Sequence, residues 1–219
     1  MAERGLTVDH TTIFRWVQRY APELEKRCRP HLKACNDSWK VDETSIKVKK
    51  IWKYLYRAVD SQGNTLEFLL SPTRDAEAAT RFFCKALPVT ADATPQTLPG
   101  KERVDSANLT TTFVPRVINV DKNAASPKAM ADLKAAGVLP EHVELRQVKY
   151  LNTLIEQDHR FIKRLTTPGM GFFSFETAWR TLQGFEMMNM IRKGQVKNVG
   201  KGDILDQVAL VSSLFGVAA

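Results

Sequence analysis

Cysteine is scarce in this chain, and long apolar runs are missing. The 219 residues include only three cysteines, which cannot form a closed set of disulfide pairs. Cys28 and Cys35 flank His31, but no fourth zinc ligand follows nearby, so incidental cysteines in a basic connector are favoured. No stretch reaches about 18 apolar residues, and the opening MAERGLTVDH lacks an apolar secretion signal. These absences predict no membrane association and a reducing cytoplasmic location.

Acidic residues are outnumbered by basic ones. Asp and Glu total 24 against 32 Lys and Arg, which gives a formal net charge of +8. Such an excess favours a polyanionic partner, and nucleic acid is the commonest one. Hydrophobic residues make up 43% of the chain, so it can bury a core without help from a disulfide or a structural metal.

The N-terminal segment has the periodicity of a helix from about residue 9 to residue 20. Arg15 and Arg19 lie four residues apart and share one side of it. A helix of this kind could enter a DNA major groove, or it could simply pack on the protein surface. Pro22 is expected to end the helix. Residues 1–36 are therefore predicted to be a truncated helix-turn-helix DNA-binding segment and a connector.

The central part alternates between strand and helix patterns. Strands are expected at 39–48, 53–60 and 65–71, as an antiparallel meander, and at 116–121 and 143–150. Helices are expected at 74–87, 126–137 and 151–165. Residues 88–115, with four prolines and no periodicity, are predicted to be an inserted loop. The sequence thus predicts an α/β core over 37–167, followed by a helical C-terminal extension over 168–219.

Three acidic residues are candidates for chemistry. Asp42 lies inside an apolar strand, Asp121 ends the fourth strand, and Glu156 begins a helix. If the first and fourth strands are neighbours, Asp42 and Asp121 lie about 4.8 Å apart. Each pair of like charges at 4 Å costs about 4 kcal/mol at an effective dielectric near 20. Divalent cations remove that cost, and carboxylate ligands suit Mg²⁺ or Mn²⁺. The alternative is that each acid is a turn or surface residue.

Three blocks of sequence carry a resemblance to a known family. WKVDETSIKVKKIWKYLYRAVDSQG, RVINVDKNAASPKAM and RQVKYLNTLIEQDHRFIKR resemble the blocks of a bacterial DDE transposase of the insertion-sequence-six family. Asp42, Asp121 and Glu156 match the family's DDE positions, with 34 residues between the last two. Lys163 matches its basic residue seven positions after the glutamate.

The resemblance implies an RNase H-like core of three antiparallel and two parallel strands. It implies metal-dependent DNA strand cleavage and strand transfer by Asp42, Asp121 and Glu156, which would hold two Mg²⁺ or Mn²⁺ ions. The implied partners are transposon-end DNA, target DNA and further copies of the chain, as a homodimer or higher oligomer. The implied location is the bacterial cytoplasm, in association with the nucleoid.

Basic residues support contact with DNA. Residues 146–201 hold ten Lys and Arg against four Asp and Glu, and Lys163 is placed to hold a phosphate. A second basic region is expected over 47–57, from Lys47, Lys49, Lys50, Lys53 and Arg57. Two other functions stay open at this point. One is an inactive DNA-binding remnant, and the other is an RNase H-like nuclease that cuts without joining.

Overall fold

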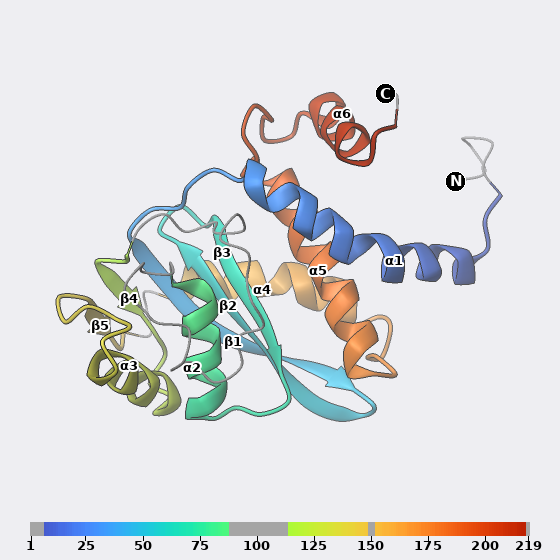
Figure 1. Cartoon of the computed structure of the whole chain (residues 1–219). Helices are drawn as coiled ribbons and strands as arrows, with labels where there is room; N and C mark the ends of the chain where they lie inside the picture. The colour runs from blue at the N-terminus through green and yellow to red at the C-terminus, as the bar shows by residue number, and fades with distance from the viewer. Residues whose placement is uncertain (1–6, 88–113, 149–151, 218–219) are drawn as a thin grey trace.

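The described part of the molecule is built around a five-stranded mixed sheet (Figure 1). The computed structural model describes residues 7–87, 114–148 and 152–217. The strands are β1 (Ser38–Val48), β2 (Ile51–Asp60), β3 (Thr65–Ser71), β4 (Val117–Asn119) and β5 (Glu144–Arg146). The first three form an antiparallel meander, β4 runs parallel to β1, and β5 runs parallel to β4. The resulting order, β3-β2-β1-β4-β5, confirms the predicted RNase H-like fold.

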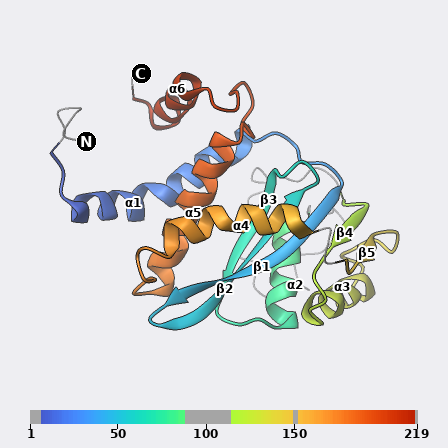
Figure 2. The same cartoon turned by 180° about the vertical axis from the view of Figure 1, so that it is seen from behind.

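Helices cover both faces of this sheet. They are α1 (His10–Cys28), α2 (Ala76–Ala86), α3 (Ala125–Ala135), α4 (Thr153–Thr166), α5 (Phe175–Arg192) and α6 (Ile204–Phe215), with a short 3₁₀ helix, η2 (Arg29–His31), after α1. Figure 1 shows α2 in front of the sheet, and Figure 2 shows α4 crossing its other face. None of the helices in the described residues is long and apolar enough to cross a membrane.

The alternation of β1 divides its side chains between two cores. Trp39 and Val41 belong to the core under α2 and α3. Ile46 and Val48 belong to the core under α4 and α5. Successive strand residues point to opposite faces, so the even-numbered positions of this strand face α4 and α5. Asp42 is one of these positions.

The structure differs from the expected elements in three places. The fourth strand is shorter than expected, because β4 covers only Val117–Asn119 and Asp121 lies beyond its end. The fifth strand is shorter than expected, since β5 covers only Glu144–Arg146. Pro22 does not end the first helix, which continues to Cys28. A proline within a helix leaves the carbonyl four residues earlier without its usual donor, and here Arg180 of α5 donates to that carbonyl, of Gln18. Most of the expected inserted loop, residues 88–113, lies outside the described residues.

Candidate active site

Asp42 lies in β1, and Asp121 lies two residues beyond the end of the neighbouring parallel strand, β4. In the pairing of β1 with β4, Ser38 lies beside Val117 and Lys40 beside Asn119. Continuing this register by two residues brings Asp42 level with Asp121, just beyond the end of β4. Alternation along β1 puts the Asp42 carboxylate on the face that α4 covers. The strand pairing therefore brings together two residues that are far apart in the sequence.

The third acidic residue lies on the helix that crosses this face. Glu156 is in the first turn of α4 and is exposed. His159 follows three residues later, on the same side of the helix, and is buried. Its Nε2 lies 3.3 Å from Oδ2 of Asp42. This contact fixes the turn of α4 that carries Glu156 beside the strand that carries Asp42.

Behind Asp42 lies a buried network of charged side chains. Arg57 is the cross-strand partner of Asp42 in β2 and has no exposed surface. Its guanidinium donates to Glu186 of α5 at 2.6 and 2.8 Å and to Asp158 of α4 at 2.6 Å. Lys193 makes a further ion pair with Asp158 at 2.6 Å. The network ties α4 and α5 to the middle of the sheet.

Two members of this network, Arg57 and Asp158, favour each other's ionised state. Burial alone would lower the pKa of Arg57, but the carboxylates of Glu186 and Asp158 raise it. Burial would raise the pKa of Asp158, but Arg57 and Lys193 lower it. The arginine therefore stays charged at zero exposure, as a buried pair with good geometry requires.

Arg57 corrects an expectation from the sequence. The sequence predicts that Arg57 and the lysines of 47–57 form a basic surface. In the structure Arg57 is fully buried and paired with acidic side chains. The sequence analysis also missed His159 and Glu186. The sequence did hold an indication of both residues, because each is a polar residue on the side of its helix that faces the core. Their partners lie 102 and 129 residues away, so no local pattern names them.

The carboxylates supply hard oxygen ligands, and these suit Mg²⁺ or Mn²⁺. Asp42 is largely buried, with 18% of its side chain exposed. Asp121 accepts a hydrogen bond from the backbone N–H of Lys122 at 2.7 Å. Within residues 7–87, 114–148 and 152–217, no three His, Cys, Asp or Glu side chains gather closely enough to hold an ion. The topology thus brings the strand of Asp42 beside the strand that precedes Asp121, without placing the three acids in contact.

The candidate DNA-binding residues fall in two places. Lys163 is exposed on α4 and lines a hollow of about 500 Å³ together with Lys47 and Trp52 of the β1–β2 hairpin. Arg15 and Arg19 are exposed on α1, at the other side of α5. The structure therefore places Lys163 on the helix of Glu156 and the two arginines on a different element.

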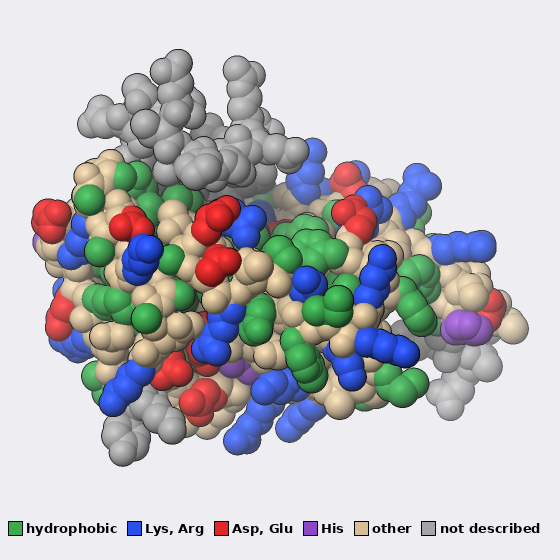
Figure 3. All heavy atoms as spheres, turned by 90° about the horizontal axis from the view of Figure 1, so that it is seen from below, with side chains coloured by type: hydrophobic (Ala, Val, Ile, Leu, Met, Phe, Trp, Pro, Cys, Tyr) green, Lys and Arg blue, Asp and Glu red, His purple; other side chains and the backbone are tan. Residues whose placement is uncertain are grey.

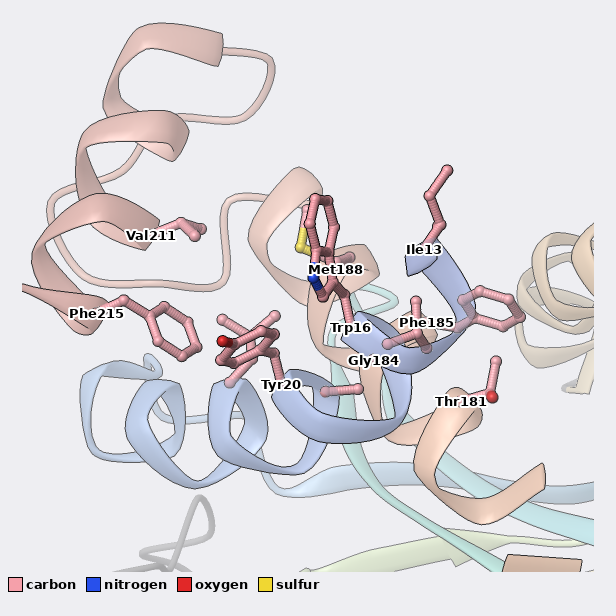
Figure 4. Close-up of a pocket in the computed structure, with 12 residues that line it drawn as sticks. Ile13, Trp16, Tyr20, Thr181, Gly184, Phe185, Met188, Val211 and Phe215 are labelled. Atoms are coloured by element: carbon pink, nitrogen blue, oxygen red, sulfur yellow. The ribbon is translucent and has the colours of Figure 1, made fainter. Parts of the chain in front are cut away.

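A second hollow is almost wholly apolar and contains none of the three acids (Figure 4). It lies between α1, α5 and α6 and has a volume of about 390 Å³. Its lining includes Trp16, Tyr20, Met188 and Phe215, and the rings of Tyr20 and Phe215 meet edge to face at 5.9 Å. The described residues that line this hollow offer no groups for phosphoryl chemistry. The candidate active site is therefore the region of Asp42, Asp121 and Glu156.

Comparison with known proteins identifies relatives along most of the chain. A family model described as a DDE domain matches residues 36–107 and 106–195. The transposase for the insertion sequence-like element IS431mec of Staphylococcus aureus strain Mu50 is 35% identical over 193 residues. That match covers 88% of this chain and 75% of the relative. The transposase for element IS257 in transposon Tn4003 of Staphylococcus aureus is 35% identical over 190 residues, or 87% and 73% of the two chains.

Solved structures with weaker similarity are viral integrase catalytic cores. The HTLV-2 integrase core in complex with magnesium, in its dimeric form, aligns with a TM-score of 0.44 and 16% identity, over 72% of this chain and 88% of that one. The BIV integrase core aligns with a TM-score of 0.45 and 12% identity, over 81% and 98%.

Proposed function

The chain belongs to the insertion-sequence-six family of bacterial DDE transposases, and we propose that Asp42, Asp121 and Glu156 are its catalytic carboxylates. As a DNA transposase, the chain is a phosphoryl-transfer enzyme, and we infer that it uses a divalent metal. The single observation that supports the residue assignment is the register of β1 and β4, which would bring Asp42 level with Asp121 if it continued two residues beyond Asn119. The contact between His159 and Asp42 supports the inclusion of Glu156, one turn away.

We propose that the three carboxylates bind two Mg²⁺ or Mn²⁺ ions when DNA is present. Their negative charges repel at short range. We therefore expect the three carboxylates to approach one another only when bound cations offset that repulsion. Bound ions would lower the barrier to an in-line displacement by stabilising the attacking and leaving oxygens. In this scheme Asp42 and Asp121 are the ligands from the sheet, and Glu156 is the ligand from α4.

The remaining parts of the chain would position DNA. Lys163 would hold a phosphate beside the carboxylates, because it lies seven residues after Glu156, or about two turns along α4. Arg15 and Arg19 would contact the duplex from α1, within a DNA-binding segment over 1–36. The catalytic core would span 37–167, and 168–219 would form the helical extension. Assembly as a dimer or higher oligomer on DNA, in the nucleoid, completes the proposal.

The test is a joining assay with Mg²⁺, DNA that carries the element's ends, and a target DNA. The wild-type chain is expected to cut and join, while Asp42→Asn, Asp121→Asn and Glu156→Gln abolish both steps. Each variant should still bind DNA, because binding depends on the basic residues. Asp132→Asn, at an exposed position of α3, is the matched control and should keep full activity.

Other outcomes would select the other functions. Cutting without joining by the wild-type chain would indicate a nuclease, and binding without cutting would indicate a DNA-binding remnant. Near-normal cutting by Asp42→Asn would refute the assignment of the carboxylates. Lys163→Ala should weaken binding to all DNA sequences about equally and lower the salt dependence by roughly one phosphate contact.

A further inference from the structure

The tip of the β1–β2 hairpin exposes large apolar side chains. Ile51 and Trp52 begin β2 and are 60% and 56% exposed. In the loop between α4 and α5, Met170 and Phe173 are 87% and 90% exposed. Trp52 and Met170 line the same hollow of about 500 Å³. Exposed apolar residues gathered in this way are typical of an interaction site.

The backbone of this tip is firmly held. The N–H of Lys49 donates to the carbonyl of Phe172 at 2.7 Å, and the N–H of Phe172 donates to the carbonyl of Lys47 at 2.8 Å. The two turn residues, Lys49 and Lys50, have φ values of 50° and 63°. Both residues of such a two-residue turn need positive φ, which Asn and Gly adopt more readily than Lys. The chain thus keeps lysine at a turn where other residues would be less strained.

The charge around the tip is positive. Lys47, Lys49 and Lys50 are exposed on the hairpin, and Lys47 Nζ lies 5.6 Å from the centre of the Trp52 ring. Lys163 lines the same hollow, and with Arg160 and Arg164 it lines a neighbouring one. Among the residues that the structure describes, no acidic side chain lines either hollow. On the face drawn in Figure 3, Lys and Arg side chains gather with hydrophobic side chains among them.

We propose that the hairpin tip is a DNA-binding element, in which the lysines hold phosphates and Trp52 stacks on a base that has left the regular helix. The inference rests on the proposed function, because it takes DNA to be the polyanion. The charge of the tip complements the phosphate backbone, and an exposed aromatic ring gives an unstacked base a surface to lie on. A buried or flexible ring could not serve in this way, whereas Trp52 is exposed on a held backbone.

The experiment measures DNA binding without any divalent metal, so that chemistry plays no part. The probes are two short duplexes that carry one unpaired base, one with the element's terminal repeat and one of unrelated sequence, each compared with its fully paired form. The variants are Trp52→Ala, Trp52→Phe, Lys50→Gln and Asp42→Asn. Lys128→Gln is the matched control, since Lys128 is exposed on α3 and lies outside the basic regions 47–57 and 146–201.

Trp52→Ala is expected to weaken binding to the unpaired-base duplex by about tenfold or more, and Trp52→Phe to retain most of the affinity. Lys50→Gln should lower the salt dependence by about one phosphate contact, and Lys128→Gln should leave it unchanged. A loss confined to the terminal repeat would assign the tip to transposon-end DNA. A loss on both sequences would assign it to target DNA.

The inference is overturned if Trp52→Ala and Lys50→Gln bind every probe as the wild-type chain does. Folding is not in question for these variants, because both side chains are exposed, and thermal melting checks it directly. The proposed function fails separately. Suppose that the wild-type chain never cuts DNA, while the Trp52→Ala variant binds the unpaired-base duplex more weakly than the wild-type chain does. The hairpin inference then stands and the catalytic proposal does not. Asp42→Asn should bind all probes like the wild-type chain.

Discussion

His159 connects Asp42 to Arg57, its cross-strand partner. The Nε2 atom of His159 lies 3.3 Å from Oδ2 of Asp42, and its Nδ1 lies 3.4 Å from a guanidinium nitrogen of Arg57. A guanidinium can only donate, so Nδ1 accepts and carries no proton. In this arrangement Nε2 carries the ring proton and donates a hydrogen bond to the Asp42 carboxylate. The imidazole thus orients Asp42, while the charge of Arg57 is balanced by Glu186 and Asp158.

The first prediction concerns this orientation. If Asp42 holds a metal ion, His159→Ala should lower the rate of strand cleavage by about 10–100-fold, because the carboxylate loses the hydrogen bond that orients it. More Mg²⁺ should recover part of the loss. The measurement is cleavage rate as a function of Mg²⁺ concentration, beside DNA affinity, which should not change. His142→Ala, at an exposed position, is the control. An unchanged Mg²⁺ dependence would show that His159 acts only in packing.

The second prediction concerns the buried ion pair of Arg57 with Glu186. Arg57→Met leaves Glu186 buried without its partner and should cost about 3–5 kcal/mol of the free energy of unfolding. Arg57→Met together with Glu186→Met should recover most of that loss, because an apolar pair needs no charge compensation. Urea unfolding of the single and double variants measures the difference. A double variant as unstable as the single one would contradict the explanation.

The third prediction concerns stability in acid. Burial would raise the pKa of Glu67, but Arg29 and Lys85 lower it from its ordinary 4.5 to about 2. The unfolded chain therefore binds more protons than the folded one between these values, and stability falls as the pH drops from 4.5 toward 2. Urea unfolding across this range should show the loss. The Glu67→Gln variant lacks the contribution of this carboxylate. The difference in free energy of unfolding between this variant and the wild-type chain should therefore narrow as the pH falls.

The control for this experiment is an acidic residue that is not buried. Glu176 pairs with Arg180 on the surface of α5, with 69% of its side chain exposed. Exposed pairs contribute little to stability, so Glu176→Gln should follow the wild-type curve. A similar acid response of both glutamine variants would mean that the stability loss comes from groups other than Glu67.

The fourth prediction concerns the loop that holds the hairpin tip. Gly171 has a φ of 108°, and a Cβ atom there would lie 2.6 Å from the carbonyl oxygen of Lys47. Gly171→Ala should cost about 1–3 kcal/mol, because the backbone becomes strained and the loop must move away from β1. Gly169→Ala is the matched control, since its Cβ would meet nothing closer than 3.8 Å. Thermal melting of the two variants distinguishes them, and equal melting would show that the loop does not hold the tip.

The sequence by itself determined the elements and the candidate acids. The meander, the helices α2 to α5 and the positions of Asp42, Asp121 and Glu156 follow from local periodicity and from the family blocks. Hydrophobic patterning encodes these features because each residue's preference depends on its near neighbours in the chain. The third and fifth strands show the limit, since β3 agrees with the expected range while β5 is cut to three residues.

Only the tertiary structure decided what surrounds the acids. The strands that carry or precede Asp42 and Asp121 pair in parallel, and the packing of α4 brings His159 between Asp42 and Arg57. The same packing changed Arg57 from an expected surface charge into a fully buried ion-pair partner. Pairs of this kind join residues more than one hundred positions apart, and the free energy of burying a charge depends on the partner that packing supplies.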